Sequence, residues 1–398
     1  MELPTELFGL NPAHVDEGDC LLLKSDNLKA LGWLLQKEHL KVDFCYIDPP
    51  YNTGSSFVYH DKRQRRDVSI WSKHHDWLAF MLPRLVATQM LLNDQGVIAV
   101  SIDDYEYPYL KILMDSVFGE INFISSLIVC RSKNGKGGKA NVAVNHEYVL
   151  LYGKTQKAAL RGVEDSDLER YDKEDEHGKY KIDGLFRKKG DASRREDRPN
   201  MFYPLYYSQD GQVYTKKIRE DLIEVWPSDS KGIERRWLWG REKAESESWK
   251  LYASAKGVVY VKNYSSANKR IKIRSILDKQ EYLNDKAARE VKLIYGEKIF
   301  ETPKPIGLIK DLIDCCSPPD AVVLDYFAGT GTTAHACYLL NKEKGACRKS
   351  ILVEHEFVIP DTHFAGVAGF RNTAEMTEFR LRKIKEADSE FDYVALAV

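Results

Sequence analysis

Two consecutive prolines at the end of a short apolar run constrain this chain more than any other feature. Residues 42–47 are mostly apolar and are followed by Asp-Pro-Pro-Tyr-Asn at residues 48–52. An apolar run of this length that is stopped by prolines is typical of a buried strand. The prolines fix two φ angles, exclude helix and remove two backbone donors, so a stiff loop must leave the strand. In open α/β sheets, the carboxyl end of a strand is where ligands bind.

The chemical groups of this proline loop suit a flat ligand that carries an amino group. Asp48 supplies a carboxylate, the loop supplies carbonyl groups, and Tyr51 supplies an aromatic face. Such a loop can accept two hydrogen bonds from an amine while a ring stacks on the tyrosine, as a flipped-out nucleobase would require. Asp-Pro is also a common turn starter, so the loop by itself fits an ordinary strand-to-turn junction about equally well.

A second strand-to-loop junction lies far along the chain. Residues 321–324 predict a strand, residues 333–340 predict a helix, and Asp-Tyr-Phe-Ala-Gly-Thr-Gly-Thr-Thr occupies residues 325–333. Its glycines let the backbone approach a ligand closely, beside the N-terminus of a helix. This glycine loop lacks the third glycine of the dinucleotide-binding fingerprint. It also lacks the Gly-Lys-Ser/Thr end of a P-loop, so ATP binding is not indicated.

Together, the two loops resemble motifs IV (DPPY) and I (FxGxG) of S-adenosylmethionine-dependent amino-methyltransferases that act on DNA. Motif IV comes first here, which is similar to the β-class order, in which the cofactor-binding half of the sheet comes last. Longer matches at residues 48–54, 302–305 and 327–336 resemble the modification (Mod) subunits of Type III restriction–modification systems. The resemblance covers residues 15–155 and 295–386, and it implies S-adenosylmethionine as cofactor and double-stranded DNA as substrate.

The apolar pattern predicts a Rossmann-like, seven-stranded, doubly wound α/β sheet. Strands are expected at residues 20–23, 42–47, 96–102, 123–129, 147–152, 321–324 and 349–353. Helices are expected at residues 28–36, 77–92, 107–117, 306–313, 333–340 and 372–387. The circularly permuted motif order puts the last two strands next to the first ones, so the two loops would meet at the topological switch point. The fifth predicted strand is close enough in sequence to the fourth to pair with it antiparallel.

Composition and resemblance divide the chain into three parts. Residues 1–152 are expected to form the target-base half of the catalytic domain, and residues 301–398 its S-adenosylmethionine-binding half. Residues 153–300 have shorter apolar runs, clustered charges and aromatic residues among lysine and arginine, which indicates an inserted α+β domain. In the resembling family this position holds the target-recognition domain. The alternative is a surface insert in which Trp237 and Trp239 form a small core.

The resemblance assigns catalytic roles to the proline loop, at Asp48, Pro49, Pro50 and Tyr51. Asp48 and the Pro49 carbonyl would accept hydrogen bonds from both amino hydrogens of the base, which favours a pyramidal, nucleophilic nitrogen. Asp48 would also stabilise the positive charge that develops on that nitrogen. Tyr51 would stack on the flipped ring and fix the in-line approach. This chemistry needs neither a metal nor a covalent nucleophile.

The resemblance also implies a cofactor site. Asp26 would reach the adenine of the cofactor, although a plain N-cap role is about equally open. Lys304 would face the methionine carboxylate, or be an ordinary surface lysine. Glu354 ends a strand where dinucleotide folds bind ribose hydroxyls, with Glu356 as its rival. The other expected cofactor contacts are Asp48, Asp325, Phe327, Ala328, Gly329, Gly331, Thr332 and Thr333.

Three groups of basic residues are candidates for contacts with DNA phosphates, and each could instead be an ordinary solvated surface. The first lies just after the proline loop, the second is rich in glycine, and the third belongs to the insert. The candidate DNA-binding residues are Lys62, Arg63, Arg65, Arg66, Arg131, Lys133, Lys136, Lys139, Arg187, Lys188, Arg235 and Arg236.

The form of the proline motif also bears on the target base. Asp first and Tyr last resemble adenine-N6 enzymes, whereas cytosine-N4 enzymes more often carry Ser first. We therefore expect a site-specific DNA methyltransferase that acts on adenine N6, in a restriction–modification or orphan modification system. Cytosine-N4 methylation is the alternative. A non-catalytic DNA-recognition subunit of a larger complex is another, against which the presence of Asp48, Tyr51, Gly329 and Gly331 argues.

Composition limits the partners and the compartment. The 398-residue chain has a formal net charge of −1, so any nucleic-acid surface must be local. Its seven cysteines are scattered without a Cys-x-x-Cys, which fits a reducing cytoplasm in a prokaryote or a phage-infected cell. No signal peptide and no membrane span is expected. The family leads us to expect a homodimer and allows a companion restriction subunit.

Overall fold

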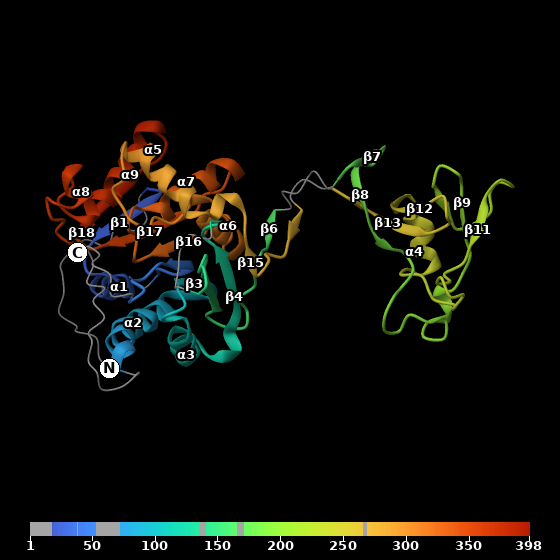
Figure 1. Ribbon diagram of the computed structural model, residues 1–398, viewed down its shortest axis with the longest axis horizontal. Helices are drawn as coiled ribbons and strands as arrows, with labels where there is room; N and C mark the ends of the chain where they lie inside the picture. Colours follow the sequence, from blue (N-terminus) through green and yellow to red (C-terminus); the bar gives the residue numbers. More distant parts are fainter. Residues whose placement is uncertain (1–17, 38, 53–71, 135–140, 165–170, 266–268) are drawn as a thin grey trace. The chain divides into compact units, whose positions relative to one another are not determined.

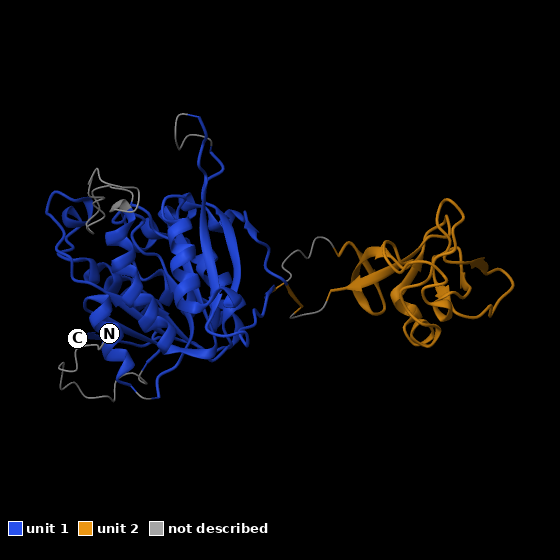
Figure 2. Cartoon of the chain, turned by 90° about the horizontal axis from the view of Figure 1, so that it is seen from below, with its two compact units in different colours: residues 1–163, 272–398 blue, residues 164–271 orange. Residues whose placement is uncertain are grey.

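The chain forms two compact units. In this computed structural model, the structure describes residues 18–37, 39–52, 72–134, 141–164, 171–265 and 269–398. The larger unit comprises residues 1–163 and 272–398, and the smaller one residues 164–271 (Figure 2). The larger unit is therefore interrupted in sequence by the smaller one, which is called the insert below. The insert is shorter than the predicted 153–300, because residues 153–163 and 272–300 belong to the larger unit.

The larger unit is built on one nine-stranded sheet (Figure 1). Its spatial order is β15 (Ile276–Leu277), β4 (Phe123–Cys130), β5 (His146–Gly153), β3 (Leu92–Ile102), β2 (Val42–Ile47), β16 (Val322–Asp325), β17 (Lys349–Glu354), β1 (Cys20–Lys24) and β18 (Tyr393–Ala397). Only β5 runs antiparallel to its neighbours β3 and β4. The seven predicted strands and the antiparallel pair are confirmed, and the short β15 and β18 add one strand at each edge.

Helices cover both faces of the sheet, which confirms a doubly wound fold. One face carries α1 (Asn27–Leu35), α2 (Ser72–Leu91) and α3 (Tyr107–Phe118). The other carries α6 (Ile306–Cys316), α7 (Thr332–Lys344) and α9 (Thr373–Ala387). Against α9 packs α5 (Asn284–Tyr295), and the short α8 (Phe364–Val367) joins the same core. Among the described residues, no helix has the length and apolar character to cross a membrane.

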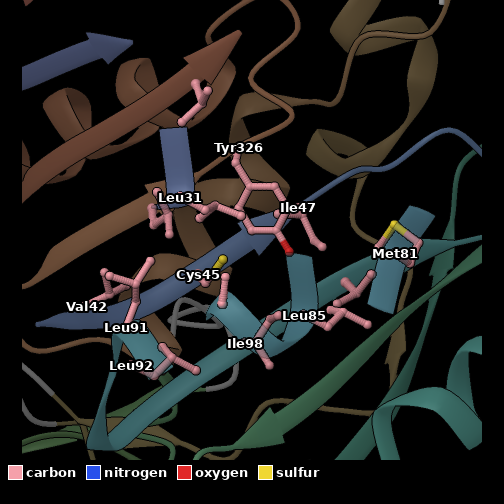
Figure 3. Packing of buried hydrophobic residues seen from close by; sticks show 14 of the residues in the cluster. Leu31, Val42, Cys45, Ile47, Met81, Leu85, Leu91, Leu92, Ile98 and Tyr326 are labelled. Atoms are coloured by element: carbon pink, nitrogen blue, oxygen red, sulfur yellow. The ribbon is translucent and has the colours of Figure 1, made fainter. Parts of the chain in front are cut away.

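Strand β2 shows why the sheet is covered on both sides. Cys45 and Ile47 point into the core under α1 and α2, near Met81 (Figure 3). Phe44 and Tyr46 point the other way, into the core under α6. All four β2 side chains are buried. This is the expected pattern of a central parallel strand, and fully burying each large apolar side chain stabilises the fold by roughly 1.5–3 kcal/mol.

The smaller unit has its own core. It contains a sheet of β12 (Leu251–Ala253), β13 (Val259–Tyr264), β8 (Gly178–Leu185) and β7 (Lys173–Asp175), a sheet of β10 (Val213–Tyr214), β9 (Leu205–Tyr207) and β11 (Ile223–Val225), and helix α4 (Arg241–Ser246). Trp237 is buried, stacks on Phe186 with the ring centroids 5.3 Å apart, and donates a hydrogen bond to the Tyr203 carbonyl. Trp239 packs edge-on against the same phenylalanine. The two tryptophans therefore belong to a small core.

Candidate active site

One cavity at the carboxyl ends of the central strands joins the two loops that the sequence singles out. Strands β2 and β16 are parallel neighbours, so the loops that leave them lie side by side. The cavity has a volume of about 640 Å³ and is lined by Asp48, Pro49, Pro50 and Tyr51 on the side of the proline loop. On the side of the glycine loop it is lined by Asp325, Tyr326, Phe327, Ala328, Gly329, Thr330, Thr332 and Thr333. Loops nearly 280 residues apart in the chain thus form one site, as the permuted motif order predicts.

Helix α2 holds the proline loop through one hydrogen bond. The indole Nε1 of Trp77 donates to the carbonyl of Pro50 over 2.6 Å. The carbonyl of Pro49 accepts no hydrogen bond from any described residue and lines the cavity with Asp48. The Pro50 carbonyl is therefore occupied and the Pro49 carbonyl is available. The Pro49 carbonyl is the acceptor named in the sequence analysis.

The end of the proline loop is fixed by a buried cluster that sequence reasoning missed. Asn52 has a positive φ of 54° and donates from Nδ2 to Oε1 of Glu106 over 2.7 Å. Nδ1 of His74 lies 2.8 Å from the same oxygen, and its ring stacks on Tyr109. A positive φ is uncommon for any residue other than glycine. The cluster therefore holds Asn52 in this left-handed backbone conformation, directly after Tyr51.

Four polar side chains meet at the proline-loop side of the cavity. The Lys304 ammonium lies 2.8 Å from Oδ1 of Asp48 and 3.5 Å from Oε2 of Glu147, and it donates to the Tyr51 hydroxyl over 2.9 Å. The Tyr51 hydroxyl in turn donates to Oδ1 of Asp48 over 2.7 Å. Burial by itself would lower the pKa of Lys304, but Asp48 and Glu147 raise it above its ordinary value. Lys304 therefore stays charged.

Two features of this cluster differ from the sequence analysis. Lys304 is directed toward Asp48 and Glu147, whereas the resemblance assigned it to the cofactor carboxylate; that contact stays a prediction. Glu147 was not predicted at all. A glutamate at the start of a predicted strand gives no sign of its partner, because charged side chains are mostly exposed and are buried only where they are paired.

The glycine loop is shaped by positive φ angles and by two carboxylates. Gly329 and Gly331 have φ angles of 55° and 75°. Oε2 of Glu354 accepts a hydrogen bond from the Gly329 amide over 2.7 Å. Asp325 accepts from the hydroxyl of Thr333 over 2.5 Å, and burial raises the pKa of Asp325 to about 7. Both carboxylates line the cavity, and the structure favours Glu354 over Glu356, which is exposed and outside the lining.

Two side chains of helix α9 donate hydrogen bonds to the glycine loop. Arg380 is buried and donates to the hydroxyls of Thr330 and Thr332 over 3.2 and 3.0 Å. Thr377 donates to the carbonyl of Gly329 over 2.6 Å. The sequence predicts an amphipathic helix here but gives no sign that one arginine turns inward.

Asp26 has the position that both sequence interpretations require. Its Oδ1 accepts hydrogen bonds from the amides of Leu28 and Lys29, so it is the N-cap of α1. It also lines the cavity, and its Oδ2 lies 3.5 Å from the guanidinium of Arg84. The N-cap role is therefore observed, and the cofactor role stays a prediction.

The candidate DNA-binding residues differ in their position and exposure. Arg131 lines the cavity and Lys133 is exposed, whereas Arg187 and Lys188 are half-buried. Outside the described residues lie Lys62, Arg63, Arg65, Arg66, Lys136 and Lys139.

Two of the insert's predicted DNA contacts need correction. Arg236 is buried and donates to the carbonyl of Ala192 over 2.6 Å, so it cannot face a phosphate in this conformation. Arg235 pairs with Asp229 over 2.8 Å and donates to Ser193 over 2.9 Å. Both guanidinium groups therefore serve the internal structure of the insert. Sequence alone could not separate an outward arginine from one that binds backbone and aspartate.

No metal site is indicated within the described part of the chain. No group of three or more histidine, cysteine, aspartate or glutamate side chains there could hold a metal ion.

Comparisons with known proteins agree with this geometry. Residues 42–359 match the N6/N4 family described as DNA methylase. Type II methyltransferase M.KpnI of Klebsiella pneumoniae is 48% identical over 393 residues, which cover 99% of this chain and 94% of that protein. The EcoPI Mod subunit of a Type III restriction-modification enzyme, from Escherichia phage P1, is 33% identical over 92% of this chain. The StyLTI Mod subunit of Salmonella typhimurium is also 33% identical, over 92% of this chain. The matches span 62% and 56% of the length of these two subunits.

Proposed function

Because the chain belongs to the N6/N4 DNA methylase family, we propose that it transfers a methyl group from S-adenosylmethionine to N6 of adenine in double-stranded DNA. The observation that carries this proposal is the single cavity in which Asp48, Pro49 and Tyr51 face the glycine loop. One side of this cavity offers hydrogen-bond acceptors for an amine. The other side is the cofactor cradle, formed by the backbone of the glycine loop beside the N-terminus of α7.

The residues of the cradle fit S-adenosylmethionine. A cavity of about 640 Å³ is within the usual range for cofactor sites. The positive φ angles at Gly329 and Gly331 turn the backbone tightly before α7 begins at Thr332. Glu354 would hold the ribose hydroxyls, and Asp26 would reach the adenine of the cofactor. Asp325, Phe327, Ala328 and Thr333 complete this side of the cavity.

The proline loop would hold the target base. S-adenosylmethionine, when bound, supplies an electrophilic methyl group on a sulfonium. Oδ2 of Asp48 accepts no hydrogen bond from the described residues, so it and the Pro49 carbonyl are available to the two amino hydrogens of a flipped adenine. Asp48 also stabilises the positive charge that develops on the nitrogen. Tyr51 supplies the stacking surface, and Pro50 keeps the loop rigid through its bond from Trp77.

The biological setting extends this proposal. Relatives carry names of Type II and Type III modification enzymes, so we place this chain in a restriction–modification or related modification system. Homodimerisation and a companion restriction subunit are part of the proposal. The insert, residues 164–271, is its proposed target-recognition domain.

Transfer of labelled methyl groups to mixed-sequence duplex DNA, followed by nucleoside analysis, tests the reaction. We expect N6-methyladenine in the product. If N4-methylcytosine is the sole product, the target is N4 of cytosine and not N6 of adenine. The absence of any transfer would favour a subunit that only recognises DNA.

An alanine substitution at Asp48 tests the mechanism. Asp48→Ala removes the acceptor of the amine and should lower kcat by at least about 100-fold, the usual effect of removing one preorganised group at a transition state. Cofactor affinity should change little. Asp76→Ala is the matched control, because Asp76 is an exposed aspartate on α2. Retained turnover in Asp48→Ala would contradict the mechanism.

A further inference from the structure

Lys304 is an unusual residue for the wall of a cavity that accepts an amine. Its side chain is only 10% exposed and that of Glu147 only 4%. Taking charges out of water costs several kcal/mol per ion unless they are paired. The Lys304 ammonium meets this demand with Asp48 on one side and Glu147 on the other. The fold therefore keeps one fixed hydrogen-bond donor next to the acceptor proposed to hold the amine.

The chemistry of an aminated base matches this arrangement. The amino group of adenine is bonded to a ring carbon that has an unprotonated ring nitrogen beside it. One edge of the base therefore presents an N–H donor next to a nitrogen acceptor. Asp48 and Lys304 present an acceptor and a donor 2.8 Å apart, which is the complementary pair. A base with a carbonyl and a ring N–H at this edge, such as guanine, would place like groups against each other.

We propose that Lys304 donates a hydrogen bond to the ring nitrogen beside the amine of the flipped base, and that Glu147 is the positioning residue that holds Lys304 there. The inference rests on the proposed function and adds to it a residue that reads the base. Asp48 releases one of the three hydrogens of the ammonium to the base, and Glu147 keeps the charge of Lys304 compensated. The pair would accept adenine and cytosine and reject guanine and thymine.

The charge state of Lys304 supports this role. Burial would lower its pKa, but Asp48 and Glu147 raise it above the ordinary value of a lysine, so Lys304 remains a donor near neutral pH. Hydrogen bonds from a charged donor are worth more than those between neutral groups. The Tyr51 hydroxyl, which accepts from Lys304 and donates to Asp48, holds the same pair in register.

Deleting single ring nitrogens from the substrate tests the proposal. The duplex carries the site identified by sequencing methylated DNA, with the target adenine kept or replaced by 1-deazaadenine or 7-deazaadenine. Both analogues keep the amine. 1-Deazaadenine lacks the ring nitrogen bonded to the amine-bearing carbon, whereas 7-deazaadenine keeps that nitrogen and lacks one in the five-membered ring, so it is the control. With the wild-type protein, 1-deazaadenine is the sensitive analogue and should lose about 10- to 100-fold in kcat/KM, the size of one hydrogen bond to a charged group, whereas 7-deazaadenine should react as adenine does. Equal rates on adenine and on 1-deazaadenine, or a loss confined to 7-deazaadenine, would overturn the proposal.

Two variants locate the effect at Lys304. Lys304→Met should lose a similar factor on adenine and show no further loss on the sensitive analogue. Lys310→Met is the matched control, because Lys310 is a lysine on α6 that pairs with Glu343 at the surface, and it should keep the wild-type discrimination. If Lys304→Met keeps that discrimination and instead loses cofactor affinity by more than about tenfold, Lys304 serves the cofactor carboxylate and the proposal is wrong.

Glu147→Gln tests the positioning role and does not depend on the folding of the lysine variant. It keeps the size of the side chain and removes its charge, so it should lower kcat/KM on adenine and reduce the penalty of the sensitive analogue. A purely structural role would lower the melting temperature and leave the analogue penalty unchanged, which would overturn this part. Failure of the wild type to methylate ordinary adenine would refute the proposed function, whereas methylation without coupling to a ring nitrogen refutes only this inference.

Discussion

Asp325 shows how burial in the cavity wall changes the chemistry of one residue. Burial raises its pKa to about 7, and the nearby charge of Asp48 adds to this effect, although hydrogen bonds from Thr333 and Phe327 oppose it. In the unfolded chain the same carboxyl group titrates near its ordinary value of about 4. The folded protein therefore binds a proton at Asp325 over a pH range in which the unfolded chain does not.

The raised pKa predicts how stability depends on pH. The contribution of Asp325 to the free energy of unfolding is fully present below about pH 4 and is lost as the pH rises through about 7. Asp325→Asn keeps an acceptor for the Phe327 amide but cannot ionise. The variant should be more stable than the wild type at pH 8 by on the order of 1–3 kcal/mol. Its free energy of unfolding should also fall less between pH 5 and 8 than that of the wild type. Denaturant unfolding of both proteins at several pH values measures the free energy of unfolding. The same pH dependence in both proteins would contradict the prediction.

Single residues are also where prediction from sequence was least complete. Asp48, Tyr51, Gly329 and Glu354 could be located because their motifs sit at strand ends, where any open sheet gathers its ligand contacts. Glu147 and Arg380 could not, since their positions depend on which buried partner each one meets. Charged residues are mostly exposed, so an isolated glutamate or arginine in a sequence is assigned to the surface by default.

The elements of the catalytic unit follow closely from the sequence. β2 begins and ends at the predicted residues, because Pro49 and Pro50 stop the run so sharply. The sequence analysis missed the five-residue strand β18 and two elements that are short or polar. β15 has only two residues, and α5 is a charged helix in which only Ala287 and Val291 are buried. An element that contributes two buried side chains leaves too weak a periodic pattern to be separated from an insert.

The proline loop should respond to the loss of its bond from α2. Trp77→Phe keeps an aromatic ring at that position but removes the Nε1 donor to the Pro50 carbonyl, together with one of the two fused rings of the indole. With that carbonyl unpaired the loop loses one restraint, and a misplacement of the base acceptors should lower kcat by about tenfold, the equivalent of one modest hydrogen bond. The affinity for S-adenosylmethionine should be unchanged. Single-turnover methylation and cofactor titration separate the two, and a pure loss of cofactor affinity would show that Trp77 acts elsewhere.

Two glycines in the left-handed region allow a matched comparison, Gly331 in the glycine loop and Gly345 at the end of α7. Gly331 has φ 75°, and a Cβ there would lie 3.2 Å from Cγ2 of Thr377. Gly345, the C-cap of α7, has φ 61° and open space around it. An alanine at either position costs about 1–2 kcal/mol of stability from backbone strain. Only Gly331→Ala should also displace the loop that Thr377 supports, and so weaken S-adenosylmethionine binding.

Thermal unfolding and cofactor titration of the two alanine variants test this comparison. Gly345→Ala reports the strain alone and should bind cofactor as the wild type does. Equal cofactor affinity in both variants would mean that the close approach at Gly331 is not needed for binding.

At the scale of the whole molecule, the cavity and the insert belong to different units of the chain. The larger unit holds every residue of the cavity, and the smaller unit has a core of its own around Trp237 and Phe186. The insert leaves and rejoins the larger unit at β6 (Val163–Glu164) and β14 (Arg270–Ile271), which pair with each other. Its two ends are therefore close together, as expected for a domain that can be inserted without disturbing its host.

This organisation predicts that the insert folds and binds DNA by itself. A fragment of residues 164–271 should unfold cooperatively and bind duplex DNA, with log affinity falling linearly with log salt by about 0.9 for each phosphate contact. Trp237→Ala removes a side chain that is 2% exposed and should cost the fragment about 3–5 kcal/mol, which abolishes both folding and binding. The chain in which a short linker replaces the insert should still bind S-adenosylmethionine, because the cavity residues lie outside the insert. It should no longer methylate a specific site. Site-specific methylation by that shortened chain would place target recognition in the larger unit, with the loops beside the catalytic cavity as its source.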